Sequence, residues 1–343
     1  MIFSNKLIDW YLVNKRDLPW RETKKPYEIW LSEIIMQQTR IEQGLPYFNR
    51  FVEEFPTVFD LAKASEEKVL KLWQGLGYYS RARNLHFTAK YVVNELNGEF
   101  PDTFDELKKL KGVGDYTASA IASFSFGEVQ PVVDGNVYRV LSRYLGIDIP
   151  INNSTSLKKF KQAAFELIDK GNPGDFNQAI MEFGAKQCKP KNPDCNACPF
   201  NDSCYALKHK KIDSLPVKLK KIKVKKRYFN YLVFITENDD TLLEKREGEG
   251  IWKNLYQFPL IETAAEVTID LIQDEQLLKD HPVQEISLYN DKPIVHKLSH
   301  QHLITKFWIV NVREIKQNSI PISSLHKFPV PILVHNFIEA FKF

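Results

Sequence analysis

Cysteine is scarce in this chain and is confined to one short segment. Among 343 residues there are four, Cys188, Cys195, Cys198 and Cys204. This grouping excludes a network of disulfides spread over the fold, and nothing in the sequence marks an oxidising compartment. Clustered thiolates suit a single soft metal centre, so a structural zinc site and an iron–sulfur cluster are both open. Zinc sites usually pair two C-x2-C arms, whereas here only Cys195 and Cys198 form such a pair.

Long hydrophobic runs are also missing. No apolar stretch approaches the roughly 20 residues of a membrane-spanning helix. The N-terminal segment carries Asp9 and has no apolar stretch followed by a small-residue cleavage site, which argues against a signal peptide. We therefore expect a protein of the reducing cytoplasm with no membrane partner. Its length fits one large domain or two ordinary ones.

The modest net charge of +4 conceals a strongly basic segment. Residues 207–227 contain ten Lys or Arg residues and one acidic residue, Asp213. Residues 1–206 are balanced in charge, and residues 228–343 are acidic. A solvated linker would explain this segment, and so would a strap that follows DNA phosphates, because a linker that crosses a duplex should be basic.

The pattern of apolar residues changes at this basic segment. Before it, apolar residues recur at helical spacing, and we find no convincing strand there. After it, residues 228–248 read as a strand, a turn and a second strand, residues 303–315 as a further strand, and residues 323–342 as a terminal helix. We predict an all-α domain over residues 1–206, a basic linker over 207–227 and an α+β domain over 228–343.

Two glycines stand one residue apart in Gly112-Val113-Gly114, between two helical segments. They allow a tight turn with exposed backbone N–H groups, and a helix start just after them would suit a DNA phosphate. Alone, they are more commonly an ordinary turn between helices. Together with the cysteine spacing, they resemble the helix–hairpin–helix (here 107–122) and iron–sulfur loop (here 188–204) of the endonuclease III and MutY family of DNA glycosylases. The resemblance implies a [4Fe–4S] cluster on the four cysteines.

Two carboxylates carry the predicted chemistry. Glu33 lies in a run of apolar helical residues, where burial should raise its pKa and suit it to general acid catalysis. Asp134 precedes Gly135 in a V-D-G-N-V segment and is expected at a helix N-terminus, where a carboxylate stays ionised. Both segments resemble MutY, which implies that Glu33 protonates the departing adenine and Asp134 stabilises the sugar cation.

The same resemblance assigns further positions around this pair. Asn136 would orient the site, and Tyr116 replaces the lysine with which lyase members of the family form a Schiff base, so that chemistry is excluded. The residues implied for the adenine pocket are Arg16, Trp20, Arg21 and Gln178, with core packing as a rival explanation for Trp20. Gln38 and Tyr78 would wedge into the base stack, as extruding a base requires.

Residues 228–343 resemble, more faintly, the MutT/Nudix-like domain of the family. They lack the R-E-x2-E-E run that binds magnesium. We therefore expect this domain to recognise the base opposite the adenine and to have no pyrophosphatase activity. The family reads 8-oxoguanine through a Phe-Ser-His loop, which implies that role for Ser299 and His300. Leu298 stands where the family has phenylalanine.

The sequence thus predicts a monomeric, monofunctional DNA glycosylase. Its partner would be double-stranded DNA containing adenine opposite 8-oxoguanine (A:8-oxoG) or guanine (A:G). Two alternative functions are open to a protein with these motifs. An oxidised-pyrimidine glycosylase with lyase activity is disfavoured by Tyr116. A DNA-binding iron–sulfur protein used for redox sensing or as a scaffold is disfavoured by Glu33 and Asp134, which binding alone does not need.

Overall fold

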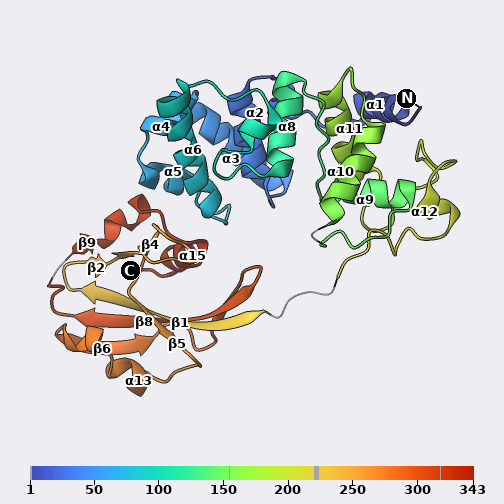
Figure 1. The fold of residues 1–343 in the computed structure, drawn as a ribbon. Coiled ribbons are helices and arrows are strands. Elements are labelled where there is room, and N and C mark those ends of the chain that lie inside the picture. Colours follow the sequence, from blue (N-terminus) through green and yellow to red (C-terminus); the bar gives the residue numbers. More distant parts are fainter. Residues whose placement is uncertain (1, 154, 220–223, 317) are drawn as a thin grey trace. The chain divides into compact units, whose positions relative to one another are not determined.

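The computed structural model describes residues 2–153, 155–219, 224–316 and 318–343, and the chain forms two compact units (Figure 1). The first unit comprises Met1–Lys63 and Asn84–Lys220, and the second comprises Ala64–Arg83 and Lys221–Phe343. This division differs from the sequence prediction at residues 64–83 and in the predicted linker, of which residues 207–219 belong to the first unit. Residues 64–83 were expected in the helical domain, but they associate with the C-terminal residues.

The described part of the first unit is helical, as predicted, and contains no strand. Its helices are α1 (Ile2–Asn14), η1 (Pro19–Arg21), α2 (Pro26–Met36), α3 (Ile41–Glu54), α4 (Val58–Lys63), α6 (Ser80–Leu96, whose first turn belongs to the second unit), α7 (Phe104–Leu107), α8 (Asp115–Phe126), α9 (Gly135–Leu145), α10 (Ser156–Leu167), α11 (Pro173–Lys186) and α12 (Tyr205–Lys208).

Two of these helices have clear start and stop signals. Helix α9 begins where the side chain of Asp134 accepts hydrogen bonds from the first free backbone N–H groups, and it ends at Gly146 with φ 75°. Helix α8 follows Gly114 and ends at Gly127 with φ 70°. A left-handed residue at a helix C-terminus is best supplied by glycine, because it has no Cβ to clash. These boundaries place Asp134 and Tyr116 at helix N-termini.

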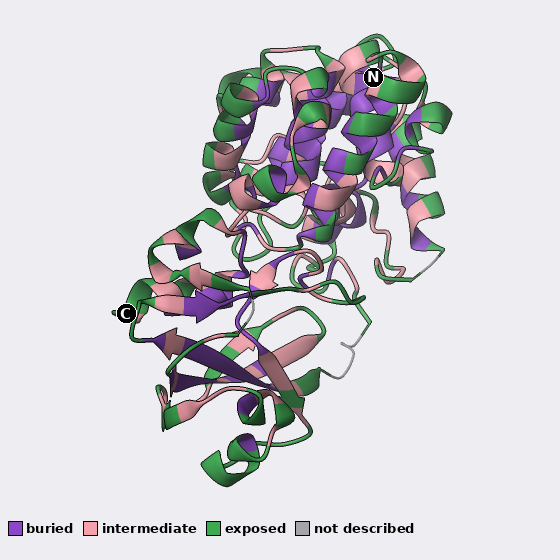
Figure 2. Ribbon diagram, turned by 90° about the vertical axis from the view of Figure 1, so that its left-hand side faces the viewer, coloured by how far each residue is buried: buried purple, intermediate pink, exposed green. Residues whose placement is uncertain are grey.

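Helices α1, α9 and α11 share one hydrophobic core, seen as the buried interior of the helical unit in Figure 2. The aromatic ring of Phe3 in α1 stacks on Phe200 at 4.6 Å and lies 4.5 Å from Tyr144 in α9. Phe200 belongs to the cysteine loop, and it also meets Phe183 of α11. The cysteine loop is therefore anchored to the helical core.

The second unit is an α+β fold, as predicted. Its helices are α5 (Glu66–Leu72), α13 (Ile269–Gln273), α14 (Gln276–Lys279), η2 (Ile322–Lys327) and α15 (Ile332–Ala340). Its strands are β1 (Lys225–Thr236), β2 (Asp240–Leu242), β3 (Glu244–Lys245), β4 (Tyr256–Gln257), β5 (Leu260–Thr263), β6 (Val283–Leu288), β7 (Ile294–Lys297), β8 (Gln301–Val312) and β9 (Ser319–Pro321).

A five-stranded sheet has the order β5-β1-β8-β6, with β7 also paired to β8. Strands β1 and β8 are parallel, and the other pairs in this sheet are antiparallel. Side chains alternate between the two faces: Leu232 packs with α13 and α14, while Phe307 stacks on Phe337 of α15 at 4.0 Å. The sheet is therefore covered on both faces by helices (Figure 1).

Strand β2 follows the turn after β1 and pairs with β9. One detail of the second unit differs from the sequence prediction. Strand β1 begins at Lys225, inside the predicted linker, because residues 225–227 join the parallel ladder with β8. Residues 220–223 of the basic segment lie outside the described residues.

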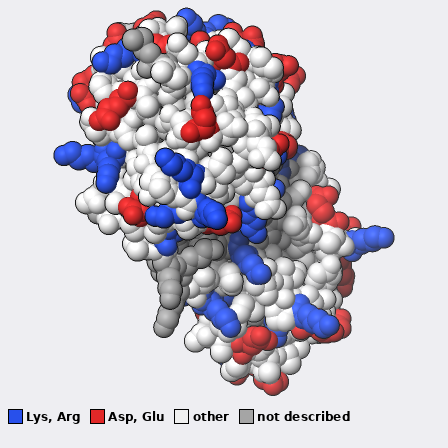
Figure 3. Space-filling view, turned by 90° about the vertical axis from the view of Figure 1, so that its right-hand side faces the viewer, with Lys and Arg blue, Asp and Glu red and all other residues white. Residues whose placement is uncertain are grey.

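The surface carries charges of both signs. Figure 3 shows Lys and Arg side chains extending from one face, with acidic side chains interspersed among them. In the part of the chain that the structure describes, no helix is long and apolar enough to span a membrane.

Candidate active site and cysteine loop

Glu33 lies in the middle of α2 and is only 8% exposed. Burial raises the pKa of its carboxyl group to about 7, and the nearby charge of Asp134 acts in the same direction. A hydrogen bond with Tyr116 and the positive charge of Arg21 oppose the rise in pKa. Glu33 is therefore a carboxylic acid that can hold a proton near neutral pH, as its apolar surroundings in the sequence predicted.

Asp134 is the N-cap of α9. Its Oδ1 accepts hydrogen bonds from the backbone N–H groups of Asn136 (2.8 Å) and Val137 (2.7 Å), and its Oδ2 accepts one from the Asn136 side chain (2.8 Å). Burial raises the pKa of Asp134, while these hydrogen bonds and Arg139 lower it. Asp134 lies at a helix N-terminus, as the sequence predicts. Its burial, which raises its pKa, was not apparent from the sequence.

Tyr116 stands in the first turn of α8, beside both carboxylates. Its hydroxyl donates to the sulfur of Met181 at 3.3 Å. Burial and the charges of Glu33 and Asp134 raise the pKa of Tyr116 well above its usual value. Tyr116 is therefore a neutral phenol close to both carboxylates, and it offers no amine.

A chain of hydrogen bonds runs from this site to the cysteine loop. Arg139 of α9 donates from Nη2 to Asn136 Oδ1 (2.9 Å) and to the Gly184 carbonyl (2.6 Å), and from Nε to the Cys188 carbonyl (2.7 Å). Asn136 in turn contacts Asp134. Asp134 and the first cysteine are thus joined through two side chains, although they are far apart in the sequence.

The predicted pocket residues meet around Glu182, which the sequence analysis did not identify. Arg16 donates to both Glu182 carboxylate oxygens, at 2.8 and 2.7 Å, and Arg21 donates to one of them at 2.8 Å. Arg21 also donates to Gln178 at 2.8 Å. Burial would raise the pKa of Glu182, but hydrogen bonds from Arg16 and Arg21 and their charges hold it at about 2. The sequence offered one sign that Glu182 belongs to this pocket. Glu182 follows the predicted pocket residue Gln178 by four positions, so both lie on one face of α11.

Trp20 lies apart from these polar contacts. Its ring is buried and meets Phe48 edge-on, with the ring centroids 5.1 Å apart. In this conformation it therefore packs in the hydrophobic core.

The Gly112-Val113-Gly114 segment forms a tight turn before α8. Gly112 has φ 83°, and a Cβ there would lie 2.8 Å from the Cβ of Asn84, so only glycine fits. Val113 is buried, while both glycines are exposed. Gln38 follows α2 as an exposed residue with φ 54°. The exposed backbone of this turn can accept a phosphate, and the Gln38 side chain is accessible to a ligand.

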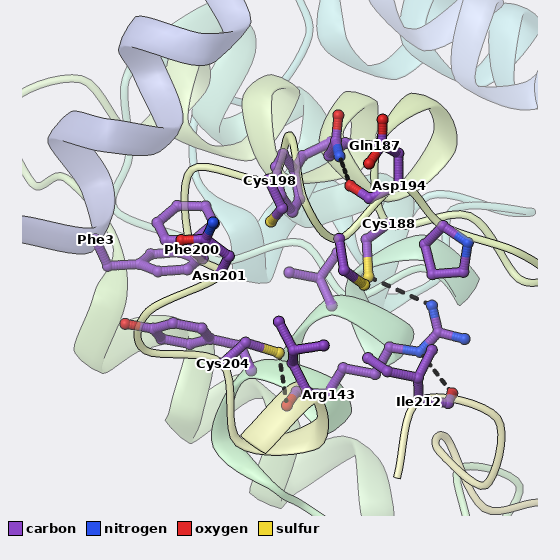
Figure 4. Close-up of a pocket in the computed structure, with 16 residues that line it drawn as sticks. Phe3, Arg143, Gln187, Cys188, Asp194, Cys198, Phe200, Asn201, Cys204 and Ile212 are labelled. Atoms are coloured by element: carbon purple, nitrogen blue, oxygen red, sulfur yellow. Dashed lines mark hydrogen bonds between the residues drawn. The ribbon is translucent and has the colours of Figure 1, made fainter. Parts of the chain in front are cut away.

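The four cysteines line one cavity in the loop after α11, and they are not joined as disulfides (Figure 4). Arg143 of α9 closes one side of this cavity. Its Nη1 approaches Cys188 Sγ at 3.5 Å and donates to the Lys189 carbonyl at 2.7 Å, and its backbone carbonyl accepts from Cys204 Sγ at 3.5 Å. No group of three His, Cys, Asp or Glu residues in the described ranges is close enough to hold a single metal ion. The four thiols and Arg143 therefore line the same cavity.

In the second unit, Tyr78, Ser299 and His300 line one cavity of about 380 Å³ together with Trp252. The hydroxyls of Tyr78 and Ser299 form a hydrogen bond. Ser299 and His300 are the two tip residues of the β7–β8 hairpin, which Leu298 and Gln301 close with a hydrogen bond of 2.8 Å. Tyr78 is 47% exposed. Tyr78, the predicted wedge, therefore lies next to Ser299 and His300, the loop predicted to recognise 8-oxoguanine (the reading loop), in the same unit.

Two protein families match this chain, each over a different part of the sequence. Residues 31–164 match the HhH-GPD superfamily of base excision DNA repair proteins, and residues 230–340 match the NUDIX domain. The first match contains Glu33, Tyr116 and Asp134, and the second contains the Ser299–His300 loop.

Individual proteins resemble the chain over its whole length or over its helical part. Adenine DNA glycosylase from Buchnera aphidicola subsp. Schizaphis graminum is 37% identical over 99% of both proteins. Human adenine DNA glycosylase is 44% identical over 60% of this chain and 39% of its own length. A thermostable thymine-DNA glycosylase structure is similar with TM-score 0.57 and 28% identity, over 61% of this chain and 96% of that one. An endonuclease III structure trapped as a covalent intermediate with DNA gives TM-score 0.52 and 25% identity, over 60% and 94%.

Proposed function

The chain belongs to the adenine DNA glycosylase family, and we propose that it excises adenine paired with 8-oxoguanine or guanine in double-stranded DNA, acting as a monomer in the cytoplasm. The observation that carries this proposal is the pair of carboxylates in different environments. Glu33 is buried with a pKa of about 7, while Asp134 accepts three hydrogen bonds at a helix N-terminus. Glycoside hydrolysis needs such a pair, one as proton donor and one as anion.

In the proposed reaction, protonated Glu33 donates its proton to N7 of the extruded adenine. The bond between N9 and the sugar C1′ then breaks, and its electron pair leaves with the base. Asp134 stabilises the positive charge on the sugar, or bonds to C1′ transiently, and Asn136 keeps its carboxylate oriented through the 2.8 Å hydrogen bond. Water then adds to C1′, releasing Asp134 if it has bonded there, and gives one proton to the Glu33 carboxylate, which restores both residues.

Tyr116 limits the reaction to hydrolysis. A phenol cannot form the imine through which a lysine cleaves the DNA strand, so the product is an intact strand with an abasic site. Around the base, the ionised Glu182 holds the guanidinium groups of Arg16 and Arg21 in place, with Gln178 beside them. In this assignment Trp20 supports the pocket through packing, and Gln38 and the 112–114 turn contact DNA.

The four cysteines would hold a [4Fe–4S] cluster. Four thiols that line one cavity, with Arg143 donating toward Cys188, fit the charge of a thiolate-bound cluster. When bound, the cluster supplies a rigid centre for the loop rather than hydrolytic chemistry. The loop itself is tied to α9 through Arg139 and Arg143, so its order is linked to the helix that Asp134 caps.

A duplex cleavage assay tests the proposed function. The protein is incubated with duplexes containing A:8-oxoG, A:G, A:C or thymine glycol, and each sample is divided into alkali-treated and untreated halves. Strand breaks that require alkali and occur with A:8-oxoG and A:G support the proposal. Breaks without alkali would instead indicate a lyase, and binding with no base release would indicate a DNA-binding protein without this activity.

A further inference from the structure

The turn that carries Tyr78 is held by the C-terminal domain, although it precedes that domain by more than a hundred residues in the sequence. Residues 64–83 form one compact unit with residues 221–343. Within this unit, helix α5 and the turn at residues 75–79 (the Tyr78 turn) contact two separate parts of the C-terminal domain. These parts are the segment 328–330 and the segment around β3 and β4.

The segment 328–330 is bonded to the Tyr78 turn and α5 through its backbone. Lys71 donates to the Phe328 carbonyl at 3.1 Å. The Val330 N–H donates to the Gln74 side chain at 3.3 Å, and the Tyr79 hydroxyl donates to the Val330 carbonyl at 3.3 Å. Both polar backbone groups of buried Val330 are therefore bonded to residues that flank or form the turn.

The second set of contacts fixes the start of α5. Glu67 accepts hydrogen bonds from the Tyr256 hydroxyl at 2.7 Å and from Lys245 at 3.1 Å. Glu66 accepts one from the Asn254 side chain at 2.5 Å. These contacts come from both strands of the β3–β4 hairpin and from the loop that joins them. They bond α5 to the C-terminal domain at a second place, apart from the segment 328–330.

The backbone of the Tyr78 turn is strained and needs such support. Tyr78 has φ 48°, a left-handed conformation that is unfavourable for a residue with a Cβ atom. Strain of this kind persists where the surrounding structure over-determines the backbone. The Gly77 carbonyl accepts from Trp73 at 3.0 Å and from Arg81 at 3.2 Å, and the Arg81 guanidinium lies 5.7 Å from the Tyr78 ring.

Tyr79 links this local support to the C-terminal domain. Its hydroxyl accepts from the Gly75 N–H at 3.4 Å while it donates to the Val330 carbonyl. The neighbouring Tyr78 side chain points to the reading loop, where it meets the Ser299 hydroxyl. The Tyr78 ring is thus positioned by the same domain that carries Ser299 and His300.

We propose that the C-terminal domain positions the Tyr78 wedge, with Tyr79 and Lys71 as positioning residues, so that recognition of 8-oxoguanine and insertion of the wedge are coupled. This inference rests on the proposed function, because it assumes that Tyr78 enters the base stack. It explains why an element of the catalytic half of the sequence folds against the recognition domain.

The test uses the full-length protein and two variants, Tyr79→Phe and Lys71→Met. Each removes one hydrogen bond to segment 328–330, and neither replaces Tyr78, Ser299 or His300. Tyr79→Phe also removes the hydrogen bond from the Gly75 N–H, and Lys71→Met also removes the one to Gln74. Single-turnover excision is measured on A:8-oxoG and A:G duplexes. Because one such bond is worth about 0.5–1.5 kcal/mol, each variant should lower the 8-oxoG-to-G rate ratio by about two- to tenfold.

Tyr27→Phe is the matched control, because the Tyr27 hydroxyl is also buried and also donates to a backbone carbonyl, that of Phe55 at 2.7 Å, within the helical unit. It should leave the ratio unchanged. Hydrogen exchange of the peptide containing residues 73–80 gives a second readout, and exchange should be faster in Tyr79→Phe and Lys71→Met than in Tyr27→Phe.

Unchanged ratios and unchanged exchange in Tyr79→Phe and Lys71→Met would overturn the inference, as would equal effects in Tyr27→Phe. If the wild-type protein released no adenine, the proposed function would fail. In that case the exchange measurement would still decide whether the C-terminal domain holds the turn.

Discussion

Replacing Glu33 by Gln should slow adenine excision by orders of magnitude and at the same time stabilise the helical unit. The side chain is 8% exposed, and its pKa rises from 4.5 to about 7 because ionisation in this apolar position is unfavourable. At about 1.4 kcal/mol per pKa unit, the ionised carboxylate costs the folded state about 3 kcal/mol. Glutamine has a similar shape and carries no charge, so it removes this cost.

The pH dependence gives the sign of the effect. Between pH 4.5 and about 7, the folded protein binds a proton at Glu33 that the unfolded chain releases, so this group favours unfolding increasingly as the pH rises through that range. The Glu33→Gln variant should therefore be about 3 kcal/mol more stable than the wild type at pH 8 and equally stable below pH 4.5. For a unit of this size, that corresponds to a rise in melting temperature of about 6–12 °C at pH 8.

Activity should change in the opposite direction. Loss of a general acid typically slows the reaction by about 10²–10⁴-fold, and in the wild type the single-turnover rate should fall as the pH rises above about 7, where Glu33 loses its proton. The assays are alkali-dependent strand cleavage and thermal unfolding over a range of pH. Glu53→Gln, on the exposed face of α3, is the matched control for both.

Two results would refute the reasoning. An equal stability difference between Glu33→Gln and the wild type at pH 4 and pH 8 would show that Glu33 is not the buried acid described here. A wild-type excision rate that stays constant from pH 6 to pH 9 would show that its proton is not used.

Four further predictions follow from the other contacts. Asp134→Asn should abolish excision but keep tight binding to A:8-oxoG, and residual single-turnover excision would exclude the assigned role. Glu182→Gln should destabilise the helical unit at neutral pH by about 3 kcal/mol, because the Glu182 pKa of about 2 gives stability that is present above pH 4.5 and lost as the pH falls toward 2; thermal unfolding at pH 7 and pH 3 checks this. Ser299→Ala combined with His300→Ala should narrow the preference for 8-oxoguanine over guanine, and an unchanged rate ratio would mean that another loop reads the base. Cys198→Ser should lower iron content and duplex affinity together, as measured by metal analysis and titration with labelled duplex; normal affinity without iron would contradict a structural role for the cluster.

The fold classes followed from the sequence because they depend on local patterns. Helical spacing of apolar residues predicted the first unit, and runs rich in β-forming residues predicted β1 and β8. The partner of β2 could not be predicted, since strand pairing depends on chain segments that are distant in sequence. The assignment of residues 64–83 to the second unit has the same cause: α5 has an ordinary helical pattern, and its contacts to Asn254, Tyr256 and Val330 are long-range.

By itself, the sequence determined the residues with distinctive chemistry and spacing: the four clustered cysteines, the Gly112–Gly114 turn, Glu33, Asp134 and the absence of a lysine at Tyr116. These are local features, because the type of each side chain and its spacing along the chain are known without the tertiary structure. Only the tertiary structure decided which groups act together. It placed Tyr116 close to both carboxylates and made Glu182 the anion that holds Arg16 and Arg21. It also joined Asp134 to the cysteine loop through Arg139 and attached the Tyr78 turn to the C-terminal domain. The physical reason is that burial and long-range hydrogen bonds, which set pKa values and side-chain positions, arise only when distant segments pack together.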